Sequence, residues 1–153
     1  MPYPADASRT LHEAFAAARR RAGHLPFLAE SALSGGTVWT FEQAGQTIDA
    51  LAKAYADKGW GPGHRVALAV GNHPRHFFHF LALNQLGASI VPLNPDHRGS
   101  EIRHALTLSG ADLVVAVPDR LDAVTDAVKD DDRLRRLPRV PVEALAQSLV
   151  PAP

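Results

Sequence analysis

The sequence predicts an α/β protein: an open, mostly parallel sheet with helices on both faces, preceded by a helix and a β-hairpin. Three short apolar runs, RVALAV at 65–70, ASIVPL at 88–93 and DLVVAV at 112–117, have the length of strands and no polar alternation. Such runs indicate strands that are covered on both faces, as parallel strands are. Segments with helical spacing of apolar residues separate the runs, and this alternation is typical of the α/β class.

Residues 1–8 are expected to be a flexible lead-in to an amphipathic helix. From Arg9 to Ala22 the apolar residues recur at helical spacing, with Ser8 or Thr10 as the N-terminal cap and Gly23 at the end. The segments HLPFLAE and TVWTF then flank a glycine-rich link at 31–36, which is the pattern of a β-hairpin.

Three consecutive arginines, Arg19 to Arg21, stand near the end of that first helix. Positive charge suits the negative pole of the helix dipole. We therefore interpret the arginines as a solvated helix end in preference to a phosphate-binding patch.

A second helix is expected to begin after Thr40. Thr40 and Gln43 have the spacing of a capping box, in which each side chain binds a free backbone amide of the first turn. The helix should end at Gly59, which can adopt a positive φ. Its apolar face should comprise Ala44, Ile48, Leu51, Ala52 and Tyr55.

The strands after position 65 are expected to alternate with three helices. The first should begin at Pro74, run to about Leu86 and be largely buried, because its apolar residues surround most of its circumference. The second should be capped by Ser100 and end at Ser109, and the third should span 118–128. These elements predict one α/β subdomain over 9–138.

A weak strand is expected near Val140, followed by a polar and proline-rich tail. We assign 139–153 to this strand and to a tail that need not be ordered. The preceding charged run at 129–139 is interpreted as a solvated surface connection.

Composition excludes several classes of function. Lysine plus arginine and aspartate plus glutamate both number 16, so no excess charge marks a surface for nucleic acid or an anionic membrane. The absence of cysteine excludes disulfides and thiolate chemistry. Neither a signal peptide nor a membrane span is visible, and we expect a cytoplasmic protein.

The candidate site lies in two polar loops, GNHP at 71–74 and NPDHRGSE at 94–101, because ligands of open parallel sheets bind at the carboxyl ends of the strands. Neither loop is a glycine-rich phosphate cradle, and no serine stands in a nucleophile motif. His73, His76 and His79 recur at every third residue, which allows a metal site, but ordinary partly buried or helix-end histidines are the preferred interpretation. Residue-level reasoning thus gives an α/β module without a complete active site.

Four motifs, however, occur in the order typical of one known family. TFEQA begins at Thr40, GWGPGHRVALAVGNHP covers 59–74, LNQLGASIVPLNP covers 83–95, and SEIRHALTLSGADLVVA covers 100–116. From about 11 to 128, the chain resembles the N-terminal part of the adenylate-forming superfamily, which includes acyl-CoA synthetases, adenylation domains of peptide synthetases and luciferases. Asn94 and Pro95 make it most similar to acyl- or aryl-CoA synthetases.

This resemblance implies a ligase that makes an acyl-adenylate from a carboxylate and ATP and then an acyl-CoA, with ATP, Mg²⁺ and CoA as cofactors. The family's phosphate loop, later acidic residues and C-terminal lid have no counterpart in the sequence. We therefore expect an N-terminal fragment that is inactive alone and binds no cofactor tightly. Its expected partners are the remainder of the ligase chain and, for the complete enzyme, a fatty or aryl acid.

One residue has a possible role by resemblance. Some relatives use a basic residue directly after the Asn-Pro pair to hold CoA phosphates. Here that position is Asp96, and Arg98 is the candidate substitute, with an exposed or helix-capping arginine as the alternative.

Two other functions stay open at this stage. The first is a free-standing, non-catalytic binding or interaction module derived from the same fold. The second is an unrelated small nucleotide-binding domain. A fragment should also expose the face meant for the rest of the enzyme, which allows a homodimer through that face.

Overall fold

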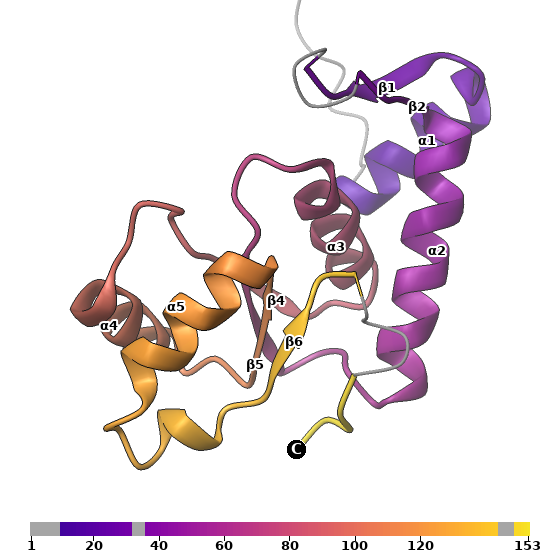
Figure 1. Cartoon of the computed structure of the whole chain (residues 1–153). Helices are drawn as coiled ribbons and strands as arrows, with labels where there is room; N and C mark the ends of the chain where they lie inside the picture. Colours follow the sequence, from indigo (N-terminus) through magenta and orange to yellow (C-terminus); the bar gives the residue numbers. More distant parts are fainter. Residues whose placement is uncertain (1–9, 32–35, 144–148) are drawn as a thin grey trace, which may run out of the picture.

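A parallel sheet lies at the centre of the computed structural model, which describes residues 10–31, 36–143 and 149–153. Its strands run in the order β4-β3-β5-β6, and every neighbouring pair is parallel (Figure 1). They are β3 (Arg65–Ala69), β4 (Ser89–Pro92), β5 (Leu113–Ala116) and β6 (Arg139–Pro141). The predicted parallel sheet is confirmed, including the strand near Val140.

The residues of the central strands divide between two apolar clusters. Val66 and Leu68 of β3 belong to a cluster with α2 (Phe41–Asp57) and α3 (Pro74–Gln85). Ala67, next to both in the strand, belongs to a cluster with α4 (Gly99–Ser109) and α5 (Pro118–Val128). Successive side chains of a strand point to opposite faces, so helices cover both sides of the sheet, as predicted.

Before the sheet come α1 (Leu11–Ala22) and a hairpin of antiparallel strands β1 (Pro26–Ala29) and β2 (Val38–Thr40). Of the two predicted caps of α1, Thr10 is the cap, and its Oγ1 accepts a 3.1 Å hydrogen bond from the Glu13 amide. Ser8, residues 1–7 and positions 32–35 of the hairpin link lie outside the described residues.

The capping box of α2 is confirmed. Thr40 Oγ1 accepts a 3.2 Å hydrogen bond from the amide of Gln43, and the Gln43 side chain accepts a 3.0 Å bond from the amide of Thr40. At the other end, α2 stops at Asp57, and Gly59 has a φ of +84°.

One expectation about a helix start is wrong. α4 begins at Gly99 with Arg98 at the cap position, so Ser100 lies inside the first turn. Glu101 explains the shift, because its carboxylate accepts a 3.1 Å hydrogen bond from the Arg98 amide. α3 is largely buried, as expected, although Phe77 is 48% exposed.

The end of the chain packs against the turn before β3. Trp60, which is 2% exposed, donates from Nε1 to the Val150 carbonyl at 2.8 Å. The Ala152 amide donates to the Lys58 carbonyl at 2.9 Å. The proposed boundaries at residues 8 and 138 stay predictions.

Arg19 joins α1 to α2. Its Nε and Nη2 donate to the two carboxylate oxygens of Glu42 at 3.0 and 2.8 Å, and its Nη1 donates to Asp49 at 2.7 Å. These hydrogen bonds, first to Glu42 and then to Asp49, raise the pKa of the Arg19 guanidinium above its usual range. Arg19 is thus an interhelical clamp, neither a solvated helix end nor part of a phosphate-binding patch.

Gly45 leaves room for this clamp. A Cβ atom at Gly45 would lie 2.5 Å from the guanidinium carbon of Arg19. The missing side chain therefore lets Arg19 lie flat across α2 and reach both of its carboxylate partners.

Alanine at Gly45 should change stability by different amounts with and without Arg19. In the native sequence Gly45→Ala should give little gain in stability, because the new methyl group displaces the clamp. In an Arg19→Ala background it should raise the free energy of unfolding by about 1 kcal/mol, the difference in helix propensity between the two residues. Urea denaturation of the four proteins of this cycle measures the coupling, and additive effects would contradict the clamp.

A buried polar contact joins α2, α3 and the segment after β6. The Tyr55 hydroxyl lies 3.1 Å from Nδ1 of His79, which is 1% exposed. Burial lowers the pKa of His79 to about 4, although a hydrogen bond with the backbone of Val142 raises it in part. Burial also raises the pKa of Tyr55 above its usual range. Both groups are therefore neutral at pH 7.

The buried His79 should make stability depend on pH. An unfolded histidine titrates near 6.5, so between about 6.5 and 4 the unfolded chain binds the proton that folded His79 excludes. The contribution of neutral His79 to the free energy of unfolding should be fully present above about pH 6.5. It should fall by up to about 3 kcal/mol as the pH approaches 4.

Urea denaturation between pH 7.5 and 4.5 measures this loss. His79→Gln should flatten the dependence on pH in this window, whereas the matched control at the exposed His24, His24→Gln, should keep it. An unchanged slope in His79→Gln would contradict the assignment.

Candidate functional site

The two loops of the candidate site meet at the carboxyl end of the sheet. β3 leads to α3 in one apolar cluster, and β4 leads to α4 in the other, so the two chains diverge to opposite faces. Ligand crevices of open α/β sheets form at such points. A hollow of about 400 Å³ is present here, lined by Gly71, Asn72, His76, Phe77, Pro92, Leu93, Asn94 and Pro95.

The loop after β3 is shaped by a turn and a helix cap. Gly71 has a φ of +66°, which turns the chain away from the strand. His73 caps α3, with its Nδ1 accepting a 3.1 Å hydrogen bond from the Arg75 amide, and Pro74 occupies the first helical position. His73 Nε2 also lies 3.9 Å from a carboxylate oxygen of Glu30, beside the hairpin.

The loop after β4 is held from a distant helix. Asn94 Oδ1 accepts a 2.9 Å hydrogen bond from the Asp96 amide. Arg120 of α5 donates through Nη2 to the carbonyls of His97 at 2.9 Å and Asn94 at 3.5 Å. Sequence reasoning missed Arg120, because no motif marks an arginine that reaches the loop from the first turn of the third helix.

Arg98 lies outside the crevice lining. Its side chain is exposed at the N-terminus of α4, and within the described residues no hydrogen bond or ion pair of its guanidinium is found. Asp96 is also exposed. The guanidinium can therefore reach an anion in solution, but its own surroundings build no binding site.

The chemistry available in the crevice is limited. Among the described residues its lining offers two asparagines and one histidine as polar side chains and contains neither a carboxylate nor a hydroxyl nucleophile. These groups can donate and accept hydrogen bonds. They do not form the paired base and nucleophile of a covalent mechanism.

The three regularly spaced histidines have separate environments. His73 caps α3, and His79 is buried against Tyr55. His76 stacks on Phe80 with ring centroids 6.2 Å apart, and burial lowers its pKa. In the parts of the chain that are described, no group of three or more metal-ligating side chains lies together.

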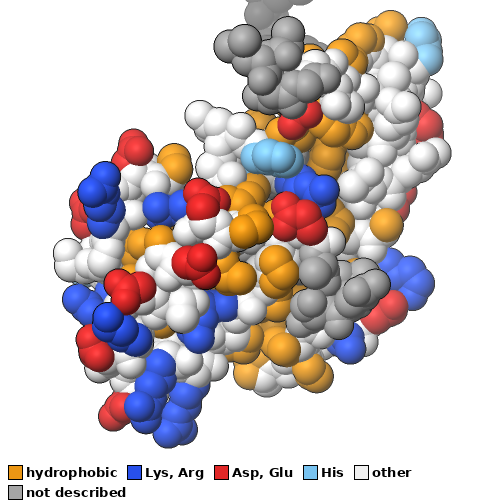
Figure 2. All heavy atoms as spheres, in the orientation of Figure 1, with side chains coloured by type: hydrophobic (Ala, Val, Ile, Leu, Met, Phe, Trp, Pro, Cys, Tyr) orange, Lys and Arg blue, Asp and Glu red, His pale blue; other side chains and the backbone are white. Residues whose placement is uncertain are grey.

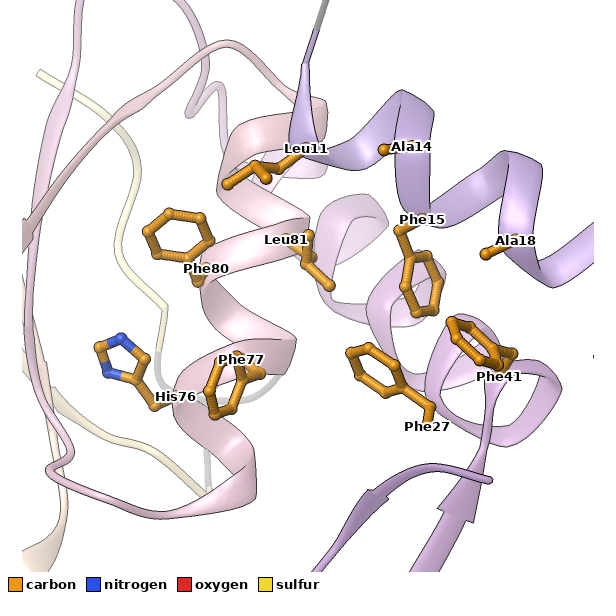
Figure 3. Close-up of a pocket in the computed structure, with 10 residues that line it drawn as sticks. All are labelled: Leu11, Ala14, Phe15, Ala18, Phe27, Phe41, His76, Phe77, Phe80 and Leu81. Carbon is orange, nitrogen blue, oxygen red and sulfur yellow. The ribbon is translucent and has the colours of Figure 1, made fainter. Parts of the chain in front are cut away.

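A second hollow, which the sequence did not predict, lies beside the crevice. It has a volume of about 520 Å³ between α1, the hairpin, the start of α2 and α3 (Figure 3). His76 and Phe77 line both hollows. The remaining lining residues are apolar: Leu11, Ala14, Phe15, Ala18, Phe27, Phe41, Phe80 and Leu81.

The described helices do not have the properties of a membrane span. In the described ranges, none combines sufficient length with sufficient apolar character to cross a bilayer.

Comparison with protein families gives one match over most of the chain. The model of the family described as AMP-binding enzyme matches residues 15–150. Feruloyl-CoA synthase from Amycolatopsis sp is 34% identical over 110 residues, which are 72% of this chain and 22% of that enzyme. Long-chain fatty acid transport protein 2 from Rattus norvegicus is 30% identical over 121 residues, or 78% of this chain and 19% of that protein. The chain thus spans about a fifth of these relatives.

Solved structures share the fold. The N-terminal domain of FACL13 from Mycobacterium tuberculosis superimposes with a TM-score of 0.79 at 20% identity, over 95% of this chain and 38% of that domain. The Klebsiella oxytoca NpsA N-terminal subdomain, solved with 3-hydroxyanthranilyl-AMSN, has a TM-score of 0.75 at 18% identity, over 94% of this chain and 33% of that one.

Proposed function

The chain belongs to the family of AMP-binding enzymes, and from this premise we propose that it is the N-terminal region of an ATP-dependent acyl-CoA ligase. The complete ligase would join a carboxylate to AMP from ATP, release pyrophosphate, and then transfer the acyl group to CoA. The observation that carries the proposal is the family match over 15–150 together with relatives that include feruloyl-CoA synthase. A fatty or aryl acid is the proposed substrate class.

We propose further that this chain alone does not catalyse either step. Among the described residues, the crevice lining offers neither a hydroxyl nucleophile nor a carboxylate, and the sequence has no phosphate loop to hold ATP. ATP and Mg²⁺ thus have no fitting site here, and no step is assigned to these residues. Their proposed role is to supply the scaffold against which the catalytic part folds.

A free-standing, non-catalytic binding module derived from the same fold is the alternative function. The family match rules out the third possibility, an unrelated nucleotide-binding domain. The polar crevice would be the binding site of such a module. A cytoplasmic location stays a prediction under either function.

The ligase proposal is tested with the isolated chain and a grafted ligase. The grafted ligase is Amycolatopsis feruloyl-CoA synthase in which this chain replaces the matched stretch. The isolated chain should show no carboxylate-dependent exchange of pyrophosphate into ATP, because it cannot hold the triphosphate. The grafted ligase should form acyl-CoA.

Two results would contradict the proposal. Exchange by the isolated chain would show that the missing parts are not needed. A folded grafted ligase without acyl-CoA formation would favour the binding module.

We also propose that Arg98 contacts a CoA phosphate in the complete enzyme. Its exposed guanidinium has no partner within the described residues, so it can pair with a phosphate without breaking an existing contact. One arginine fits one phosphate group and cannot by itself bind the cofactor tightly. No tight binding of CoA to the isolated chain is therefore expected.

Loss of Arg98 should weaken the use of CoA selectively. In the grafted ligase, Arg98→Gln should raise the KM for CoA roughly threefold to tenfold, because one partly solvated charge pair is lost, and leave the KM for ATP unchanged. Arg20→Gln on α1 is the matched control, since Arg20 is also exposed. Equal KM values for CoA in the two variants would refute the assignment.

A further inference from the structure

Large exposed apolar side chains gather in one region of the molecule. Among the described residues, four of the five large exposed apolar side chains belong to α1, the hairpin region or α3, namely Leu11, Leu25, Val38 and Phe77. The fifth is Leu108 on α4. Charged side chains instead gather over α4, α5 and the connection that follows (Figure 2). α1 and α2 also carry exposed charged side chains, among them Arg20, Glu42 and Lys53. The exposed apolar side chains are therefore a local feature of the region around α1, the hairpin and α3.

The hollow of about 520 Å³ lies in this region. Its inner wall is a packed aromatic group, in which the rings of Phe15 and Phe27 are 4.9 Å apart and those of Phe27 and Phe41 are 5.0 Å apart. Its rim holds Leu11, which is 57% exposed, and Phe77, which is 48% exposed. The wall is therefore preformed, and Leu11 and Phe77 of the rim stay exposed among the described residues.

One polar atom at the hollow also lacks a partner. Nδ1 of His76 is buried, and within the described residues no hydrogen bond reaches it. A buried nitrogen of this kind normally has a partner, since leaving it unsatisfied costs free energy. An element that covers the hollow could supply the missing hydrogen bond.

The fold comparison supplies a candidate partner for this surface. The chain matches the solved N-terminal domain from Mycobacterium tuberculosis over 95% of its own length but accounts for only 38% of that domain. That solved domain therefore contains further structure beyond the region seen here. The surroundings of the hollow are suited to packing against such structure, because their exposed residues Leu11 and Phe77 are large and apolar.

We propose that the apolar hollow between α1, the hairpin and α3 is the docking surface for the part of an AMP-binding enzyme that follows this region in its longer relatives. The docking part places an apolar side chain between Leu11 and Phe77 and forms a hydrogen bond with His76. This inference rests on the proposed function, because it takes the remainder of the ligase as the partner.

Hydroxyl-radical footprinting of the isolated chain and of the grafted ligase tests the docking surface. Oxidation of Leu11 and Phe77 should fall roughly fivefold or more in the grafted ligase, because an apolar patch at an interface loses its contact with water. Leu108, which is 78% exposed on the opposite layer, should be oxidised equally in both proteins. Unchanged oxidation of Leu11 and Phe77 would overturn the proposal.

A substitution gives a second readout. Phe77→Asp should leave the melting temperature of the isolated chain nearly unchanged and lower that of the grafted ligase by roughly 4 °C or more, because only there is a charge buried. Leu108→Asp is the matched control and should change neither. A loss of the same size from Leu108→Asp, or none from Phe77→Asp, would overturn the proposal.

Other occupants give other results. If protection of Phe77 in the isolated chain grows with protein concentration, the proposal is wrong and the occupant is a second copy of the chain. If added palmitate protects Leu11 and Phe77 in the isolated chain, and the ligand-free grafted ligase shows no protection, the proposal is wrong and the hollow is a fatty-acid site. Protection without acyl-CoA formation would refute the ligase proposal alone, whereas activity with Phe77 still oxidised would refute the docking surface alone.

Discussion

The two-sided burial of the central strands governs this structure. Val66 and Ala67 of β3 and Val114 and Val115 of β5 are fully buried, although neighbours along each strand point to opposite faces of the sheet. Helices must therefore cover both faces. Because the chain leaves β3 for one helical layer and β4 for the other, the same requirement separates two loops and opens the crevice at their divergence.

Most of the fold follows from local rules in the sequence. The capping pair Thr40 and Gln43, the apolar strand runs and the glycine stops each depend on a few consecutive residues, and they predicted their elements within one or two positions. The start of α4 was misplaced because a neighbour changed the local rule. Glu101 moved it ahead of Ser100.

The candidate site was predictable only in part. Topology placed the two polar loops together, since the carboxyl ends of parallel strands share one edge. Arg120 bonds a loop that is distant in the sequence, and Arg19 bonds a second helix. The sequence around an arginine does not indicate which of many possible acceptors its side chain will reach. The apolar hollow requires α1, the hairpin and α3 to converge, which no single segment encodes.

The packing of the chain end has a practical consequence for surface-based measurements. Val150 and Ala152 are bound to the turn that precedes β3, at the amino end of the sheet, whereas the crevice opens at the carboxyl end (Figure 1). A tether attached after Pro153 would thus hold the molecule by the edge farthest from the crevice. A sensor chip prepared in this way would present the polar loops to the flowing solution without steric blocking.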